Sequence, residues 1–217
     1  MDKMIAKLGF YSALAACIAA TGFSVAQILQ VLGFVVYPLD VILINGFSLC
    51  IAPPFLIAMV ALHYSILPEK KFWSHVALLF ATIYVVYVTL NYVVQFVVVM
   101  PKPVNDSSVA ILAVSPQSLF WTIDGLGYIF MGLSTLFAAF VFVNEGLQKW
   151  VRWFFIANGL LVPVISVVYF YPHFSIALLF LAFPWVITVP DSMLLLTLFF
   201  KSNMHSQVII TSNSVVH

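Results

Sequence analysis

Asp124 is a carboxylate in an otherwise apolar stretch of the sequence, and it is the first residue to consider for chemistry. Within a membrane such a group costs free energy unless it faces a partner or a water-filled cavity, so an intramembrane aspartate indicates a functional site. Asn91 and Gln95, in the apolar run before it, are four residues apart and therefore project from one face of a helix. Asp124 lies about 9 Å inside the outer end of its run, and the two amides reach the same depth.

Further polar side chains are expected in the same layer. Gln27 lies in the first apolar run, Asn45 lies in the second, and Tyr128 follows Asp124 by one helical turn. Together these groups favour a polar pocket or access path that opens outward, with Asp124 as its charged or protonatable centre.

The same layer has a second interpretation as a packing contact. The amides and the carboxyl group would then satisfy one another between helices, with each hydrogen bond contributing about 1 kcal/mol. Gly125, Gly127 and Gly132 follow on the same helix and would allow a neighbouring helix to approach closely. A close crossing beside Asp124 is compatible with either interpretation.

Asp191 and Asn158 form a second, inner group. The sequence Thr188-Val189-Pro190-Asp191 has the form of a capping box with an early proline, so the last helix would restart there. The alternative is a functional carboxylate beside Asn158, which lies at a comparable depth in the inner leaflet. Arg152, closer to the surface, would then be an ion-pair partner of Asp191.

Other chemistries find no support in the sequence. His63 and His75 flank one turn, but no Cys or carboxylate has the spacing to complete a metal site with them. Hydrolase elbows, zinc-protease motifs and phosphate-binding glycine loops are absent from the sequence. Asp124 and Asp191 are expected in different leaflets, where they would not cooperate as an acid and base pair. An enzyme acting within the bilayer is therefore the third interpretation, after binding and a subunit role, and we expect no cofactor and no metal.

The composition identifies a membrane protein. Hydrophobic residues make up 64% of the 217 residues and charged residues only 7%, against about a quarter in soluble domains. A net charge of +1 gives no basic surface for nucleic acid. Cys17 and Cys50 lie in apolar runs, so a disulfide framework is not expected.

Runs of about 20 apolar residues, the length that crosses a bilayer, predict an all-α integral membrane protein with six transmembrane helices. The runs are 8–34, 41–65, 72–100, 118–143, 151–170 and 174–200. Prolines inside the second, fifth and sixth runs predict kinks in those helices: Pro53, Pro54, Pro163, Pro184 and Pro190. The tail 202–217 is too short to span and begins with polar residues. The whole chain would form a single membrane domain.

The distribution of basic residues predicts the orientation. Lys102 falls on one side of the predicted membrane, and the other seven basic residues fall on the opposite side: Lys3, Lys7, Lys70, Lys71, Lys149, Arg152 and Lys201. The positive-inside rule then places both termini in the cytoplasm and the long connection 101–117 outside. Asn105 in that connection begins an N-glycosylation acceptor sequence. We expect the plasma (inner) membrane as the location.

Two functions from different classes fit these observations. The first is a multi-pass protein that binds or transports a small or lipid-like molecule through the outer polar layer, with membrane lipids around it. The second is a non-catalytic accessory subunit or assembly factor of a larger complex, which would have a membrane protein or a second copy as its partner.

Overall fold

The computed structural model describes residues 2–103 and 106–213, and within them all side chains except those of residues 176 and 205–213. Every regular element among the described residues is helical. In chain order these are α1 (Lys3–Val31), α2 (Leu39–Ser65), η1 (Pro68–Lys70), α3 (Lys71–Val94), η2 (Gln95–Val99), α4 (Leu119–Ala138), η3 (Ala139–Val141), α5 (Gly146–Leu160), α6 (Val162–Phe170), α7 (Ile176–Leu181) and α8 (Trp185–Asn213). Asn105, the predicted glycosylation acceptor, lies outside the described residues.

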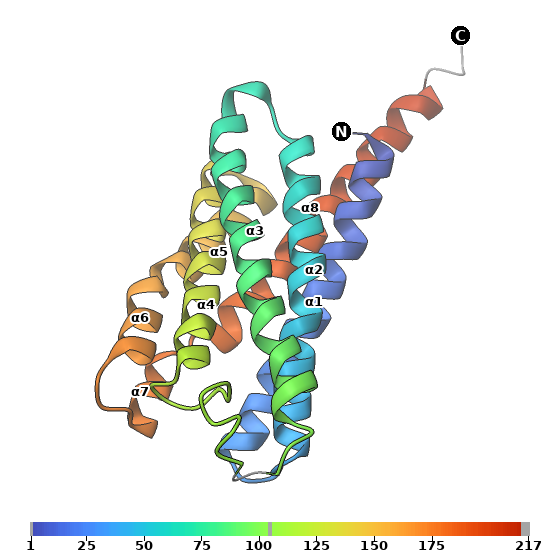
Figure 1. Cartoon of the computed structure of the whole chain (residues 1–217). Helices are drawn as coiled ribbons and strands as arrows, with labels where there is room; N and C mark the ends of the chain where they lie inside the picture. Colours follow the sequence, from blue (N-terminus) through green and yellow to red (C-terminus); the bar gives the residue numbers. More distant parts are fainter. Residues whose placement is uncertain (1, 104–105, 214–217) are drawn as a thin grey trace.

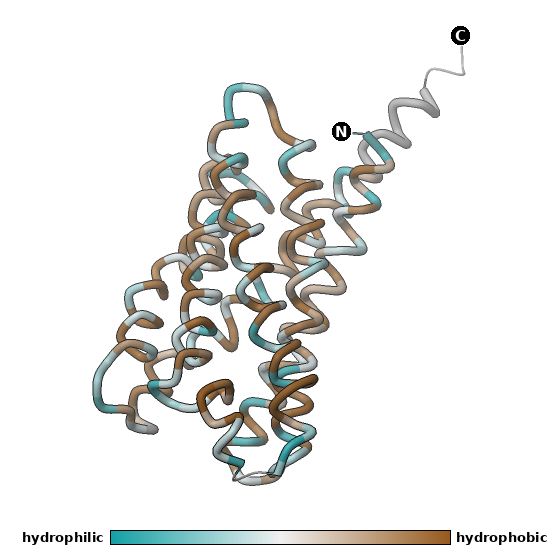
Figure 2. Tube along the Cα trace, viewed as in Figure 1, coloured by the Kyte–Doolittle hydropathy of each residue, from teal (hydrophilic) through white to brown (hydrophobic). Residues whose placement is uncertain are grey.

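Within the described part of the chain, six helical segments are long and apolar enough to cross a membrane, which confirms the prediction of an all-α fold with six such helices. Their bounds are Lys3–Val31, Leu39–Ser65, Pro68–Val99, Leu119–Val141, Gly146–Phe170 and Ala177–Met204. Apolar residues run along the full length of these helices (Figure 2). The protein is therefore an integral multi-pass membrane protein.

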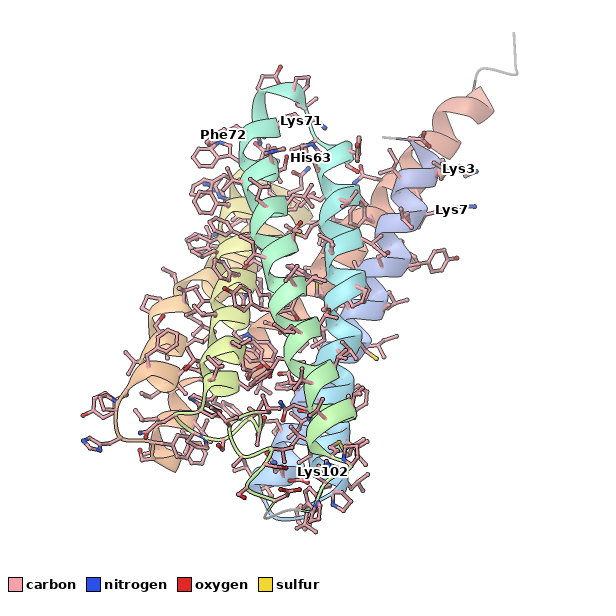
Figure 3. The ribbon with its side chains drawn as sticks, in the orientation of Figure 1. Lys3, Lys7, His63, Lys71, Phe72 and Lys102 are labelled. Atoms are coloured by element: carbon pink, nitrogen blue, oxygen red, sulfur yellow. The ribbon has the colours of Figure 1, made fainter. Side chains whose placement is uncertain are left out.

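The helices form two groups, which meet where α2 packs against α3 and where α8 packs against α5; Figure 1 shows the arrangement. The first group packs α1 against both α2 and α8. The second group packs α4 against α3, α5 and α6, while α7 contacts α6. Lys3, Lys7 and Lys71 lie at one end of the bundle and Lys102 lies at the other (Figure 3). We call these the basic end and the Lys102 end.

Small residues allow the first group to pack closely. Ala13, Ala16 and Ala20 of α1 are fully buried, as are Ala52 and Ala58 of α2. In a membrane, where helix association depends on contact and not on exclusion of water, such residues bring two backbones together. The resulting scaffold holds one wall of the cavity described below.

The last span is interrupted, but not where the sequence predicted. The restart expected at Thr188–Asp191 is wrong in position, because α7 ends at Leu181 and α8 begins at Trp185, with Pro190 inside it. Thr188 N–H donates to the Pro184 carbonyl at 2.9 Å, so it is already part of the helix and needs no cap. In the fifth span, Leu161 separates α5 from α6, whereas α2 continues through Pro53 and Pro54. Bends at these prolines stay predictions.

Candidate functional site

A hydrogen-bond network surrounds Asp124, whose side chain is only 5% exposed. Asn91 Nδ2 and the Tyr92 hydroxyl donate to Asp124 Oδ1 at 3.0 and 2.7 Å. The Tyr169 hydroxyl donates to Asp124 Oδ2 at 2.9 Å. The Tyr92 and Tyr128 hydroxyls are a further 3.0 Å apart. The network thus joins α3, α4 and α6 through one carboxyl group.

Local sequence features place Asp124 and Tyr169 against each other. Ser118 caps α4 by accepting a hydrogen bond from Trp121 N–H at 3.0 Å, which fixes where the helix begins. The Trp121 indole N–H in turn donates to the Tyr169 carbonyl at 3.1 Å. Gly125 supplies the space, since a Cβ there would lie 2.6 Å from the Tyr169 ring. The glycine next to Asp124 therefore lets the phenol reach the carboxylate.

The structure brings only part of the predicted polar layer to Asp124. Asn91 bonds to it directly, and Tyr128 joins through the Tyr92 hydroxyl. Gln95 does not reach it, because it lies a further turn, about 6 Å, toward the Lys102 end. Its side chain instead binds the connection before α4, donating to the Leu112 carbonyl at 2.8 Å and accepting from Val114 N–H at 3.2 Å.

The two remaining predicted residues also lie apart from Asp124. Gln27 donates to Gln30 Oε1 at 2.9 Å, and Gln30 donates to Asp40 Oδ2 at 2.9 Å. Asn45 is buried on α2, at 6% exposure, and no hydrogen bond joins it to Asp124 in the described structure. The expected layer is thus divided, with a network at α3, α4 and α6 and separate polar contacts at α1 and α2.

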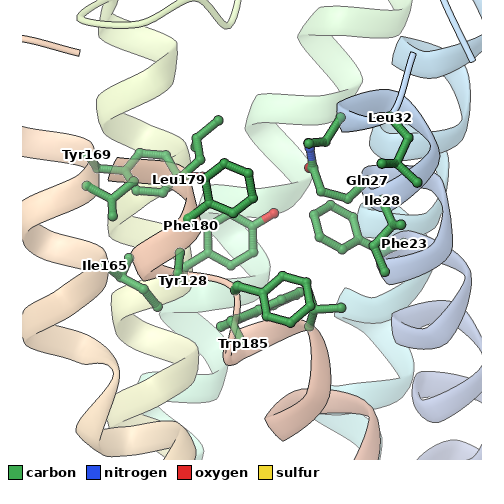
Figure 4. A pocket seen from close by; sticks show the side chains of 15 residues that line it. Phe23, Gln27, Ile28, Leu32, Tyr128, Ile165, Tyr169, Leu179, Phe180 and Trp185 are labelled. Carbon is green, nitrogen blue, oxygen red and sulfur yellow. The ribbon is translucent and has the colours of Figure 1, made fainter. Parts of the chain in front are cut away.

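A cavity of about 240 Å³ adjoins the Asp124 network. Aromatic side chains form much of its wall: Phe23, Tyr128, Tyr169, Phe180, Phe183 and Trp185 (Figure 4). The other lining residues are aliphatic apart from Gln27, and none is charged. Trp185 packs edge-on against Phe23 and Tyr128, with ring centroids 5.2 and 5.0 Å apart. The cavity is therefore apolar, with a polar amide on the α1 side.

Tyr128 and Tyr169 belong to both the cavity and the network. Their rings line the cavity, while their hydroxyls lie on the Asp124 side. A molecule in the cavity would therefore touch rings whose hydroxyl groups are one or two hydrogen bonds from the carboxylate. This geometry connects an apolar cavity to a single buried carboxyl group.

Sequence reasoning missed Tyr92 and Tyr169 as members of the network. Tyr92 is adjacent to Asn91 and therefore outside the stripe of residues three and four apart that was followed along α3. Tyr169 is 45 residues from Asp124 in sequence, so no local pattern links them. The available signal was Gly125, because a glycine beside a buried carboxylate indicates a large neighbouring side chain.

The inner group is likewise not assembled as an acidic site. Asn158 is buried at 1% exposure; its Nδ2 donates to Thr135 Oγ1 at 2.9 Å, and its Oδ1 accepts from Thr188 Oγ1 at 3.3 Å. Among the described residues, no hydrogen bond or ion pair joins Asp191 to Asn158 or to Arg152. Asn158 therefore connects α4, α5 and α8 as a packing contact.

The histidine pair lies at the basic end. The His63 and His75 rings are 5.8 Å apart, and His63 Nδ1 lies 2.8 Å from Ser74 Oγ. No group of three or more His, Cys, Asp or Glu side chains arranged to hold a metal ion occurs in the part of the chain that the structure describes.

No protein-family model matches this chain, and neither do curated proteins or solved structures. Function is therefore inferred from the geometry of the site alone.

Proposed function

We propose that this membrane protein binds a small apolar or lipid-like molecule in the cavity beside the Asp124 network. The observation that carries the proposal is the shared wall, in which Tyr128 and Tyr169 both line the cavity and reach toward the buried carboxyl group. A concave apolar space with a few convergent polar groups is the usual form of a small-molecule site.

The lining indicates the chemistry of the ligand. Because no charged side chain lines the cavity, an ionic group placed there would lose its hydration without gaining a counter-ion. Gln27 contributes the amide, whose nitrogen is engaged by Gln30 while no described residue donates to its oxygen. We infer a neutral ligand with a hydrophobic body and a hydrogen-bond donor directed at Gln27 Oε1.

The helix arrangement suggests entry from the lipid. The cavity lies between α1 on one side and α6 and α7 on the other, yet α1 packs against α2 and α8 while α6 packs against α4, α5 and α7. Side chains of Phe180 and Phe183, both largely exposed, form the edge of this gap. A molecule dissolved in the bilayer would reach the cavity by moving these rings, without crossing the connections at either end.

The orientation we propose places both termini in the cytoplasm of a plasma (inner) membrane. Lys3, Lys7 and Lys71 at the basic end then face inward, and Lys102 faces outward (Figure 3). The Asp124 network and the cavity accordingly lie in the half of the membrane nearer the outer surface. Binding alone, or binding as one step of transport between leaflets, would use this same site.

Mass spectrometry of the purified protein tests the proposal. Small molecules extracted from the wild-type protein are compared with those from Ala182→Trp, which fills the cavity, and from Ala177→Trp, an exposed position on α7 that does not line it. We expect one neutral lipid-like species to be enriched in the wild type and in Ala177→Trp and lost from Ala182→Trp. Equal extracts from all three proteins would refute a cavity ligand, and a stoichiometric partner protein would favour the subunit function.

A further inference from the structure

Among the described residues, no cationic side chain bonds to the Asp124 carboxyl group. All three of its hydrogen bonds come from neutral donors. The titratable side chains that face it are phenols, namely Tyr84 and Tyr92 of α3, Tyr128 of α4 and Tyr169 of α6. Among the described residues, α2 and α5 present no titratable group to it. Removing a carboxylate from water without a counter-ion is unfavourable, and a proton is the simplest way to neutralise it.

A chain of hydroxyl groups leads from Asp124 to the cavity wall. Asp124 Oδ1 lies 2.7 Å from the Tyr92 hydroxyl, which lies 3.0 Å from the Tyr128 hydroxyl. Ser48 of α2 is buried beside both phenols and interacts with each of them. A serine hydroxyl can both donate and accept, so it can exchange hydrogen-bond roles with a phenol beside it.

The Ser48 hydroxyl can accept a hydrogen bond in the protonated form of the network. With Asp124 ionised, the Tyr92 hydroxyl donates to the carboxylate, and the Tyr128 hydroxyl can donate to Tyr92. With Asp124 protonated, the carboxyl O–H donates to Tyr92, Tyr92 donates to Tyr128, and Tyr128 donates to Ser48 Oγ. The network can therefore pass between the two protonation states by rotating hydroxyl hydrogens, with no movement of a helix.

Occupancy of the cavity would favour the protonated form. A neutral apolar molecule against the Tyr128 and Tyr169 rings excludes water from the space beside the network. Loss of nearby water disfavours a charged carboxylate and favours a neutral one. Because linkage is reciprocal, a protonated Asp124 then strengthens binding of the molecule by the same factor.

We propose that Asp124 is a proton-binding site linked to the cavity, so that one proton and one neutral ligand bind together. Each binding event adds one proton from hydronium to an Asp124 oxygen, forming a carboxyl O–H bond and releasing water. The linkage rests on the ligand site proposed above, whereas the proton site stands on the hydrogen-bond network alone.

Infrared difference spectroscopy of the protein in lipid tests the proton site by itself. On acidification we expect a carboxyl C=O stretching band that is present in the wild type and absent from Asp124→Asn. Tyr92→Phe is a second variant that keeps the carboxyl group and removes its phenol partner, so the band should persist at a shifted frequency. A band that is unchanged in Asp124→Asn, or absent from the wild type throughout the pH series, would overturn the proton site.

Binding of Nile red, a neutral apolar dye, tests the linkage. Its affinity should rise about 5-fold or more from weakly alkaline to weakly acidic conditions in the wild type. Asp124→Asn should bind with the tighter affinity at every pH, and Ser48→Ala should reduce the pH dependence. An affinity that is independent of pH in the wild type overturns the linkage. Dye binding that Ala182→Trp leaves intact overturns the cavity site and the linkage together, while the infrared band still decides the proton site.

Discussion

The Tyr169 hydroxyl donates a hydrogen bond to Asp124 Oδ2 at 2.9 Å, across the contact between α6 and α4. Its ring stacks at a tilt on Trp121, with centroids 4.5 Å apart, and also lines the cavity. A single side chain therefore links a buried carboxyl group, a helix contact and the cavity. The first prediction follows from this bond.

Tyr169→Phe should destabilise the protein by about 1 kcal/mol, because it removes one donor from a buried carboxyl oxygen while keeping the ring. Unfolding in a denaturing detergent measures the change. Tyr171→Phe is the matched control, since Tyr171 is 51% exposed and two residues away. Equal stability of the two variants would show that the Tyr169 hydroxyl contributes nothing.

Gly125→Ala should lower the stability of the folded protein, although it adds only one methyl group. The added Cβ would lie 2.6 Å from the Tyr169 ring, so the ring must shift, at a cost of about 1 to 3 kcal/mol. Gly46→Ala is the control, because its Cβ would meet only Phe96, at 3.8 Å. There we expect a neutral effect or a gain of up to about 1 kcal/mol from helix propensity. The same unfolding measurement compares them, and the reverse order would contradict the close contact.

Gln95→Leu should loosen the connection before α4. The change leaves the Leu112 carbonyl and the Val114 N–H without their side-chain partner. Hydrogen exchange at Val114 should accelerate, while Gln148→Leu at the basic end should leave it unchanged. If exchange at Val114 does not respond to Gln95→Leu, the amide does not hold this segment in the membrane-embedded protein.

The proposed orientation is tested by single cysteines in a protein lacking Cys17 and Cys50. Ser107→Cys and Glu69→Cys introduce exposed thiols beyond the Lys102 end and at the basic end. In intact cells a membrane-impermeant maleimide should label the first and not the second, because only the first faces outward. Labelling of Glu69→Cys alone would invert the orientation.

Sequence and structure agree where the signal is periodic or compositional. Continuous apolar runs suffice to predict the six spans, because crossing the hydrocarbon demands length and apolarity at every position. Asn91 beside Asp124 was also predictable, since consecutive spans of similar length bring residues of equal depth together. The sequence therefore predicted the spans themselves and a contact between two consecutive helices.

Other features depended on information that no local pattern carries. Tyr169 bonds to Asp124 across a contact between helices that are not consecutive in the sequence. Gln95 bonds to the connection before α4 instead of to Asp124, and the sequence does not show which of several polar neighbours a side chain will bind. The break in the last span falls at Pro184 and not near Pro190. Either proline could break a helix, because each lacks a backbone N–H, and the sequence alone does not show at which of the two the helix will be interrupted. The cavity itself arises between α1 and α6, which are far apart in sequence.

A cryo-EM map of the protein in a lipid nanodisc tests the central claim most directly. We predict a discrete, elongated density in the cavity, bounded by Phe23, Tyr128 and Trp185, that is retained in Ala177→Trp and absent from Ala182→Trp. A wild-type map in which the side chains of Phe180 and Phe183 close over an empty space, with lipid density only at the outer surface of the bundle, would contradict it.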